Sequence, residues 1–110
     1  MITTAYARGA AFERRVRDAL EARGWWVIRS AGSHSPADLV AWGPTACWMV
    51  QAKRSGLPSL ADRVALLAWA ERAQATAVLV RPLLRGLDWR TWDHRARRWV
   101  PLDAEEPWGT

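Results

Sequence analysis

The sequence predicts an α/β fold in which a mixed sheet is flanked by helices. Short apolar runs rich in β-branched residues are typical of strands, and two longer segments place apolar residues at helical spacing. Their order along the chain is α-β-β-β-α-β-β, which favours a sheet with a helix packed on each face or end. The 110 residues leave room for one modest core, so a single domain is expected to span residues 1–110.

The first predicted helix covers residues 8–23, and Gly24 follows as a natural C-terminal stop. Its apolar residues recur at helical spacing, at Phe12, Val16, Ala19 and Leu20. Composition alone makes Arg14, Arg15 and Arg17 an ordinary charged face. Glu13 borders the apolar stripe, so it is either a solvated carboxylate or a functional group.

Three strands are predicted next, at residues 25–30, 38–42 and 47–53, with an exposed Gly/Ser/Pro-rich loop at 31–37. The second and third strands flank Gly43 and Pro44 and are predicted to form a hairpin. If that turn centres between Pro44 and Thr45, residues whose numbers sum to 89 lie opposite each other. Trp48, Val50 and Ala52 then share the face that can pack against a helix.

A second helix is predicted to begin at Ser59, where Asp62 completes a pattern like a capping box, and to end near Gln74. Its predicted apolar stripe consists of Leu60, Val64, Leu67 and Ala68. The segment 76–81 follows as a buried strand, and residues 87–93 and 97–100 supply one or two more.

The chain contains nine tryptophans, an unusual number for this length. Core packing is the expected role of Trp25, Trp26, Trp48 and Trp69. Trp89, Trp92 and Trp99 are interleaved with arginines, and two roles stay open for them: a dimer surface, or stacking on unpaired bases.

The charge balance points to an acidic partner. The formal net charge is +5 and the pI is near 10.9, which favours nucleic acid. Of the 16 basic residues 15 are arginine, and Lys53 alone is lysine. In a chain so biased toward arginine, the retained lysine marks a position where a compact ammonium is hard to replace. Lys53 is therefore a candidate functional residue before any motif is considered.

The hairpin register brings polar groups together. Asp38 is expected opposite Gln51, and strand alternation puts Gln51 and Lys53 on one face. Oxygen ligands of this kind bind a hard cation such as Mg²⁺, which polarises a phosphate and acidifies a water, while an adjacent ammonium stabilises the developing charge. The arrangement suits phosphodiester hydrolysis.

At this point the sequence resembles a known family. Gly9, Glu13, Arg14, Gly24 and Val27, then RSAGS at 29–33, DLVA at 38–41 and Gln51-x-Lys53 reproduce, in order and spacing, the pattern of the archaeal-type (Hjc) Holliday junction resolvases, members of the PD-(D/E)xK nuclease superfamily. The match is close over residues 8–53; beyond them only the layout agrees.

The resemblance implies a restriction-endonuclease-like fold and a homodimer that grips a four-way DNA junction and nicks two strands symmetrically with Mg²⁺, or Mn²⁺ as a substitute. The catalytic residues it implies are Glu13, Asp38, Gln51, Lys53 and Ser33. The metal ligands it implies are Glu13, Asp38, Gln51 and the backbone carbonyl of Ala52. The DNA contacts it implies are Arg8, Arg14, Arg29, Ser30, Ser33, His34 and Arg54.

The sequence departs from the family pattern at two places. Gln51 stands where a glutamate is usual, and its amide oxygen can bind a cation but brings no charge, so metal affinity is expected to fall. The loop from Ser33 to Asp38 is slightly longer, and its His34 either approaches a phosphate or is simply solvated.

Other functions remain open on the sequence alone. A nuclease of the same fold could act on flaps, single strands or mismatches, and a decayed site would leave a DNA-binding module without activity. The single cysteine, Cys47, is expected to be buried filler and not a nucleophile, and His94 with Asp93 is too isolated to indicate a metal site. With no apolar segment of membrane-spanning length and no signal peptide, an intracellular, cytoplasmic protein is expected.

Overall fold

The structure is a computed structural model that describes residues 4–30 and 35–102. Six strands form one sheet in the order β1-β2-β3-β4-β5-β6; β3 and β4 are parallel, and every other neighbouring pair is antiparallel. The elements are α1 (Ala5–Glu21), β1 (Trp26–Arg29), β2 (Leu39–Trp42), β3 (Cys47–Ala52), α2 (Leu60–Ala73), β4 (Thr76–Pro82), β5 (Leu87–Asp93) and β6 (Arg98–Pro101). The predicted order is confirmed, and β6 extends it by one strand.

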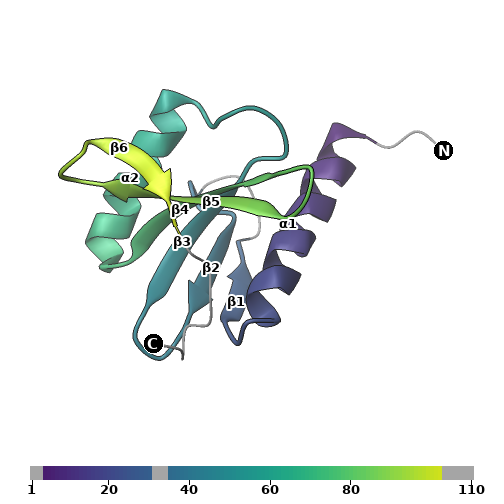
Figure 1. The fold of residues 1–110 in the computed structure, drawn as a ribbon, viewed down its shortest axis with the longest axis horizontal. Coiled ribbons are helices and arrows are strands. Elements are labelled where there is room, and N and C mark those ends of the chain that lie inside the picture. The colour runs from purple at the N-terminus through teal and green to yellow at the C-terminus, as the bar shows by residue number, and fades with distance from the viewer. Residues whose placement is uncertain (1–3, 31–34, 103–110) are drawn as a thin grey trace.

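The two helices cover opposite faces of the sheet (Figure 1). The alternation of β3 proves this, because Trp48 and Val50 belong to the cluster that contains α1, whereas Met49 belongs to the cluster that contains α2. The predicted helix-facing set of Trp48, Val50 and Ala52 is therefore confirmed, with Ala52 at the edge of the cluster.

The α1 face holds the larger core. Phe12, Val16 and Leu20 are buried along α1, as their spacing predicts, and they pack on buried residues of β2, β3 and β4. Thr4 caps the helix by accepting a hydrogen bond from the Ala7 N–H at 3.0 Å. This packing fixes the helix against the sheet and so fixes the position of Glu13, which follows Phe12.

The ends of α2 agree with the prediction, but its buried stripe does not. Ser59 accepts a hydrogen bond from the Asp62 N–H at 3.1 Å, and Gln74 ends the helix in the left-handed conformation with φ of 55°. The helix packs on the sheet through Leu66 and Ala70. The predicted stripe of Leu60, Val64, Leu67 and Ala68 is wrong, since Leu60 and Val64 are 70% and 56% exposed, Ala68 is exposed and Leu67 is half-buried.

The tryptophans are also distributed differently from the prediction. Trp25 and Trp48 are buried as expected, with ring centroids 4.4 Å apart, but Trp26 and Trp69 are exposed. Trp89, expected at the surface, is buried beside Trp48 at 6.2 Å. The reason is strand alternation: Trp89 pairs with Val80, whose side chain is in the α1 core. Trp26 points to the face of the sheet that α2 covers, but it lies on edge strand β1, whereas α2 packs mainly on β3 and β4.

Among the described residues, neither helix is long and apolar enough to cross a membrane.

Candidate active site

The β2–β3 hairpin has the predicted register. Leu39 pairs with Val50 and Trp42 with Cys47, so partner numbers sum to 89. Beyond Leu39 the ladder becomes irregular, because the Asp38 N–H donates to the Val50 carbonyl at 2.8 Å. Asp38 thus lies beyond the last regular pair, and its contacts go to Val50 and Ala52, the two neighbours of its predicted partner Gln51.

The carboxylate of Asp38 is held by the backbone of β3. Its Oδ2 accepts a hydrogen bond from the Ala52 N–H at 2.8 Å, while the Ser30 N–H donates to the Asp38 carbonyl at 2.8 Å. The residue that follows β3 is anchored as well, since the Lys53 N–H donates to the Val80 carbonyl at 2.9 Å. The position of Asp38 therefore depends on β1, β2 and β3 together, and that of Lys53 on β4.

Glu13 brings a second carboxylate from α1 to the same place. Its Oε2 accepts a hydrogen bond from Arg29 Nε at 3.2 Å and lies 3.1 Å from Arg29 Nη2 in an ion pair, so both nitrogens of the guanidinium fork meet this one oxygen. Glu13 lies close enough to the Asp38 carboxyl to raise the pKa of that group. Residues of α1, β1 and the start of β2 converge at this one point.

The pKa of Asp38 is raised to about 6. Burial of the carboxyl is the main cause, and the neighbouring Glu13 carboxylate adds to it; the Ala52 N–H and the Lys53 ammonium act in the opposite direction. The two acids therefore repel each other in a partly buried site, and such a pair favours a bound cation or a shared proton.

Gln51 provides a test of whether the site suits a cation. Its Oε1 is buried and has no hydrogen-bond partner among the described residues. An unpaired buried amide oxygen costs free energy unless a donor or a cation meets it. The described residues contain no cluster of three His, Cys, Asp or Glu side chains; two carboxylates with one amide oxygen nevertheless form a donor set that a hard cation accepts. The residues fit Mg²⁺ or Mn²⁺.

Comparison with known proteins agrees with this geometry. The sequence model of the family described as archaeal Holliday junction resolvase (Hjc) matches residues 4–94. The chain belongs to this family. Among solved structures, Archaeoglobus fulgidus Hjc, a Holliday junction resolvase from an archaeal hyperthermophile, superposes with a TM-score of 0.65 at 26% identity, over 76% of this chain and 70% of that chain. No curated protein sequence matches significantly.

The matched range of the resolvase family includes Glu13, Asp38, Gln51 and Lys53. The structure places Glu13 and Lys53 both close enough to the Asp38 carboxyl to shift its pKa, Glu13 upward and Lys53 downward. Gln51 lies in β3 directly before Ala52, and no hydrogen bond joins its Oε1 to Asp38 or Glu13 among the described residues. The predicted role of the Ala52 carbonyl stays a prediction.

The predicted DNA contacts fall into three groups. Arg8, Arg14 and Arg54 are exposed, as a phosphate contact requires. Arg29 and Ser30 take part in the site itself, through the Glu13 fork and the hydrogen bond to Asp38. Ser33 and His34 lie outside the described residues.

Two features of the site were missed by reading the sequence. One is the ion pair of Arg29 with Glu13, which gives a further role to a residue whose predicted DNA contact stays a prediction. The other is the hydrogen bond from the Ala52 N–H to Asp38. Strand alternation could have predicted it, because the residue between Gln51 and Lys53 turns its side chain to the opposite face and leaves its backbone beside the neighbouring strand. Cys47 is half-buried, and burial raises the pKa of its thiol, which agrees with a filler role.

Proposed function

We propose that this chain is a structure-selective endonuclease that resolves four-way DNA junctions by paired nicks and depends on a divalent cation. The observation that carries the proposal is the convergence of Glu13, Asp38 and Lys53 at the end of the β2–β3 hairpin. Membership of the resolvase family supports the substrate, since branched DNA is what the name of that family specifies. The net charge of +5 suits a polyanionic partner.

Glu13, Asp38 and Gln51 are the residues proposed to hold Mg²⁺, with Mn²⁺ as a substitute, and the Ala52 carbonyl is the fourth proposed ligand. When bound, such a cation polarises a phosphate and lowers the pKa of a coordinated water. The buried, unpaired Oε1 of Gln51 supports the assignment, as does the repulsion between the two carboxylates.

Each protein group has a task that follows from its contacts. Arg29 holds Glu13 and the Ala52 N–H holds Asp38, so that both carboxylates stay oriented before the substrate arrives. Lys53 is exposed beside Asp38, and its ammonium is proposed to stabilise the negative charge that develops on the phosphate during hydrolysis. Arg8, Arg14 and Arg54, with Ser33 and His34, are proposed to contact the DNA backbone.

The decisive experiment offers the protein three labelled substrates, a four-way junction, a flap and a linear duplex of matched sequence, each with EDTA, Mg²⁺ or Mn²⁺. Metal-dependent nicks at symmetric positions of the junction, with little cleavage of the duplex, are expected. Preferred cleavage of the flap would assign the chain to a different nuclease activity, and junction binding without cleavage in any metal would make it a binding module.

We also propose that the chain forms a homodimer with twofold symmetry, because one small chain does not easily reach two symmetric scissile phosphates. The uncovered sides of α2 support it. Leu60 and Val64 are exposed on one side of the helix, and Trp69 is exposed on the other, beside an apolar cavity of about 360 Å³ that Met49 also lines. Light scattering at micromolar concentration is expected to give twice the chain mass, and Val64→Arg is expected to give the chain mass. Ala11→Arg, an exposed site on α1, is the matched control. A monomeric wild type, still monomeric when bound to a junction, would exclude the dimer.

A further inference from the structure

The turn that joins β5 to β6 carries three exposed arginines, Arg95, Arg97 and Arg98. We call residues 93–98 the arginine turn. Elsewhere in the described chain several arginines pair with carboxylates: Arg17, Arg29, Arg81 and Arg90. Within the same described ranges, the side chains of Arg95 and Arg97 make no ion pair or hydrogen bond. Their positive charge is therefore available to a binding partner.

The one acid of the turn is used to build it. Asp93 Oδ1 accepts hydrogen bonds from the backbone N–H groups of Arg95 at 2.9 Å and Ala96 at 3.0 Å, and these bonds hold the pKa of Asp93 below its ordinary value. The Asp93 carbonyl accepts from the Arg97 N–H at 2.7 Å. The backbone of the turn is thereby closed without any bond from an arginine side chain.

Arg97 occupies a strained backbone position. Its φ is 56°, in the left-handed region that favours glycine, and this chain places Gly24, Gly56 and Gly86 at its other positive-φ turns. Gln74, the remaining exception, is an ordinary helix C-cap. Glycine would adopt this backbone conformation without strain. An arginine at this position therefore indicates that its side chain has a role other than stabilising the turn.

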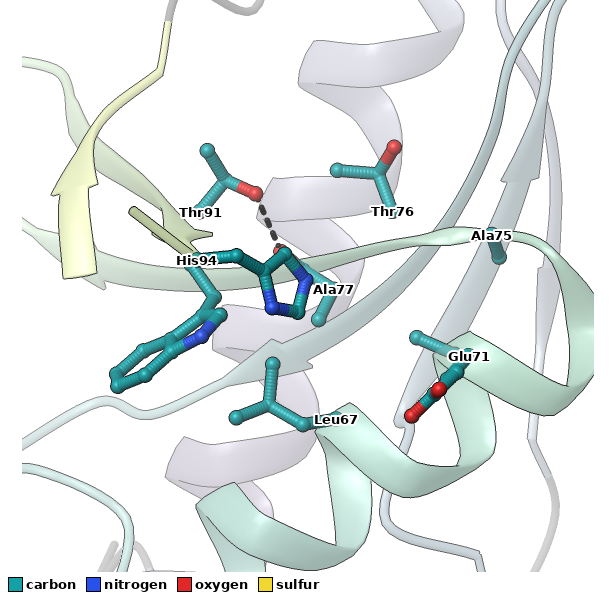
Figure 2. Close-up of a pocket in the computed structure, with 9 residues that line it drawn as sticks. Leu67, Glu71, Ala75, Thr76, Ala77, Thr91 and His94 are labelled. Atoms are coloured by element: carbon teal, nitrogen blue, oxygen red, sulfur yellow. Dashed lines mark hydrogen bonds between the residues drawn. The ribbon is translucent and has the colours of Figure 1, made fainter. Parts of the chain in front are cut away.

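The hairpin that carries the arginine turn is fixed to the body of the protein, because Trp99 packs against the core cluster that contains α2. Trp92 and Trp99 flank the turn and meet edge to face, with ring centroids 5.7 Å apart, and Asp93 pairs with Arg98 across the hairpin. Figure 2 shows His94 at the rim of a cavity of about 290 Å³ that Leu67 and Glu71 of α2 also line. A turn held in this way loses little conformational entropy when it binds a partner.

The turn lies at the opposite end of the sheet from the candidate active site. Ala52 is level with Val80 and Trp89 in neighbouring strands, and Asp93 is four residues further along β5. At about 3.3 Å per residue and about 4.8 Å between strands, the separation from Ala52 is roughly 15–20 Å. Phosphates of one DNA strand follow each other every ~3.4 Å along the helix axis, so the turn can meet a phosphate about five nucleotides from the one at the site.

We propose that the arginine turn binds the sugar-phosphate backbone of a duplex arm, several base pairs from the scissile phosphate. This proposal rests on the proposed function and adds to it a second anchoring point on the substrate. Charge complementarity selects duplex DNA as the occupant, because three guanidinium groups face solvent while the only acid of the turn is engaged with backbone N–H groups. The family match ends at residue 94, so Arg95, Arg97 and Arg98 lie outside the part shared with the family.

The test measures binding in EDTA, so that no cleavage interferes, to two four-way junctions. One has hairpin-capped arms of five base pairs and the other has arms of fifteen. The variants are Arg97→Gly and the triple change Arg95→Ala, Arg97→Gly and Arg98→Ala. The matched control is Arg23→Ala, which removes an equally exposed arginine at the end of α1. Salt titrations and melting temperatures accompany each binding curve.

We expect wild type to bind the long-armed junction more tightly, and Arg97→Gly to lose about two- to fivefold of that affinity. The triple variant binds that junction at least roughly tenfold more weakly, and its slope of log K against log[salt] becomes shallower by about 0.9 for each phosphate that is no longer neutralised. Neither change affects the short-armed junction, and Arg23→Ala changes neither substrate. Because glycine relieves the strained φ, Arg97→Gly melts at the wild-type temperature or above it.

Unchanged long-arm affinity and salt slope in the triple variant would overturn the proposal while leaving the proposed function intact, provided that wild type still nicks junctions with Mg²⁺. A change in the molecular mass of the triple variant without a change in DNA binding would make the turn a protein interface, which also overturns it. A wild type that neither binds nor nicks junctions would remove the proposed function and this inference together.

Discussion

The two faces of the sheet are covered by helices of similar kind but to different extents. On one face α1 buries Phe12, Val16 and Leu20 against a large core, and the same helix carries Glu13 into the candidate site. On the other face α2 fully buries only Leu66 and Ala70, and three of its large apolar residues are exposed: Leu60, Val64 and Trp69. The apolar stripe of α1 is therefore covered by the sheet of its own chain, whereas the exposed apolar residues of α2 are the ones that the proposed second copy would cover.

The largest expected effect is on the face that carries the chemistry. Asp38→Asn and Lys53→Ala should each reduce junction cleavage by at least roughly a thousandfold, because they remove a proposed metal ligand and the cation proposed to stabilise developing charge. Junction affinity should stay within a few-fold, since affinity comes mainly from arginine contacts to phosphates. Single-turnover cleavage measures catalysis, and binding in EDTA measures affinity. An equal loss of binding in both folded variants would contradict the separation of catalytic residues from binding residues.

A second comparison concerns stability. Leu20→Ala should cost about 2–5 kcal/mol of the free energy of unfolding, because Leu20 is fully buried and the change leaves a cavity. Val64→Ala should cost about 0.5 kcal/mol or less in the monomer. Urea unfolding at low and at high protein concentration separates the two cases. If Val64 lies in a dimer contact, the destabilisation caused by Val64→Ala grows with protein concentration, whereas the destabilisation caused by Leu20→Ala stays constant.

A third prediction follows from the raised pKa of Asp38, about 6 in the folded protein. The folded state holds this proton more tightly than the unfolded state, so the contribution of Asp38 to stability falls as the pH rises from about 4 through 6. In EDTA, Asp38→Asn should therefore be more stable than wild type at pH 7 by about 2 kcal/mol, after allowance for partial solvent screening. The difference should vanish near pH ~3.5, below both pKa values. Asp18→Asn, at an exposed position, is the control.

The smallest expected effect tests the departure from the family pattern. If Gln51 binds the catalytic cation, Gln51→Glu adds a negative charge and should lower the Mg²⁺ concentration for half-maximal nicking by roughly tenfold, which corresponds to about 1.4 kcal/mol. Wild type should also reach half-maximal activity at lower Mn²⁺ than Mg²⁺. A metal titration of both proteins on one junction measures this, and an unchanged or higher requirement in the variant would exclude Gln51 as a ligand.

The elements that the sequence predicts well are those set by local spacing. The α1 stripe, the hairpin register and the Ser59 cap depend on neighbours along the chain or on one tight turn, and all three are confirmed. The α2 stripe and the tryptophans depend on which strand lies under them. Leu66 and Leu67 are equally apolar, and only the packing of α2 on β3 and β4 selects Leu66.

In the candidate site, too, the contacts set by local spacing could be predicted and the contacts between distant elements could not. The opposition of Asp38 to the Gln51 region could be predicted, because it needs only the hairpin. The ion pair between Glu13 and Arg29 could not, since it requires the placement of α1 beside β1, and nothing in the spacing of these residues encodes that approach.

The parallel pairing of β3 with β4 has a consequence for biosynthesis. All residues of the candidate site precede residue 54, yet the Lys53 N–H is bonded to Val80, which leaves the ribosome only after α2. Parallel strands need such a crossover, and contacts distant in sequence form late in folding. A nascent chain can thus form α1 and the hairpin before Lys53 acquires its anchor. We expect the nuclease to gain activity only once β4 has formed, so that incomplete chains do not cut DNA.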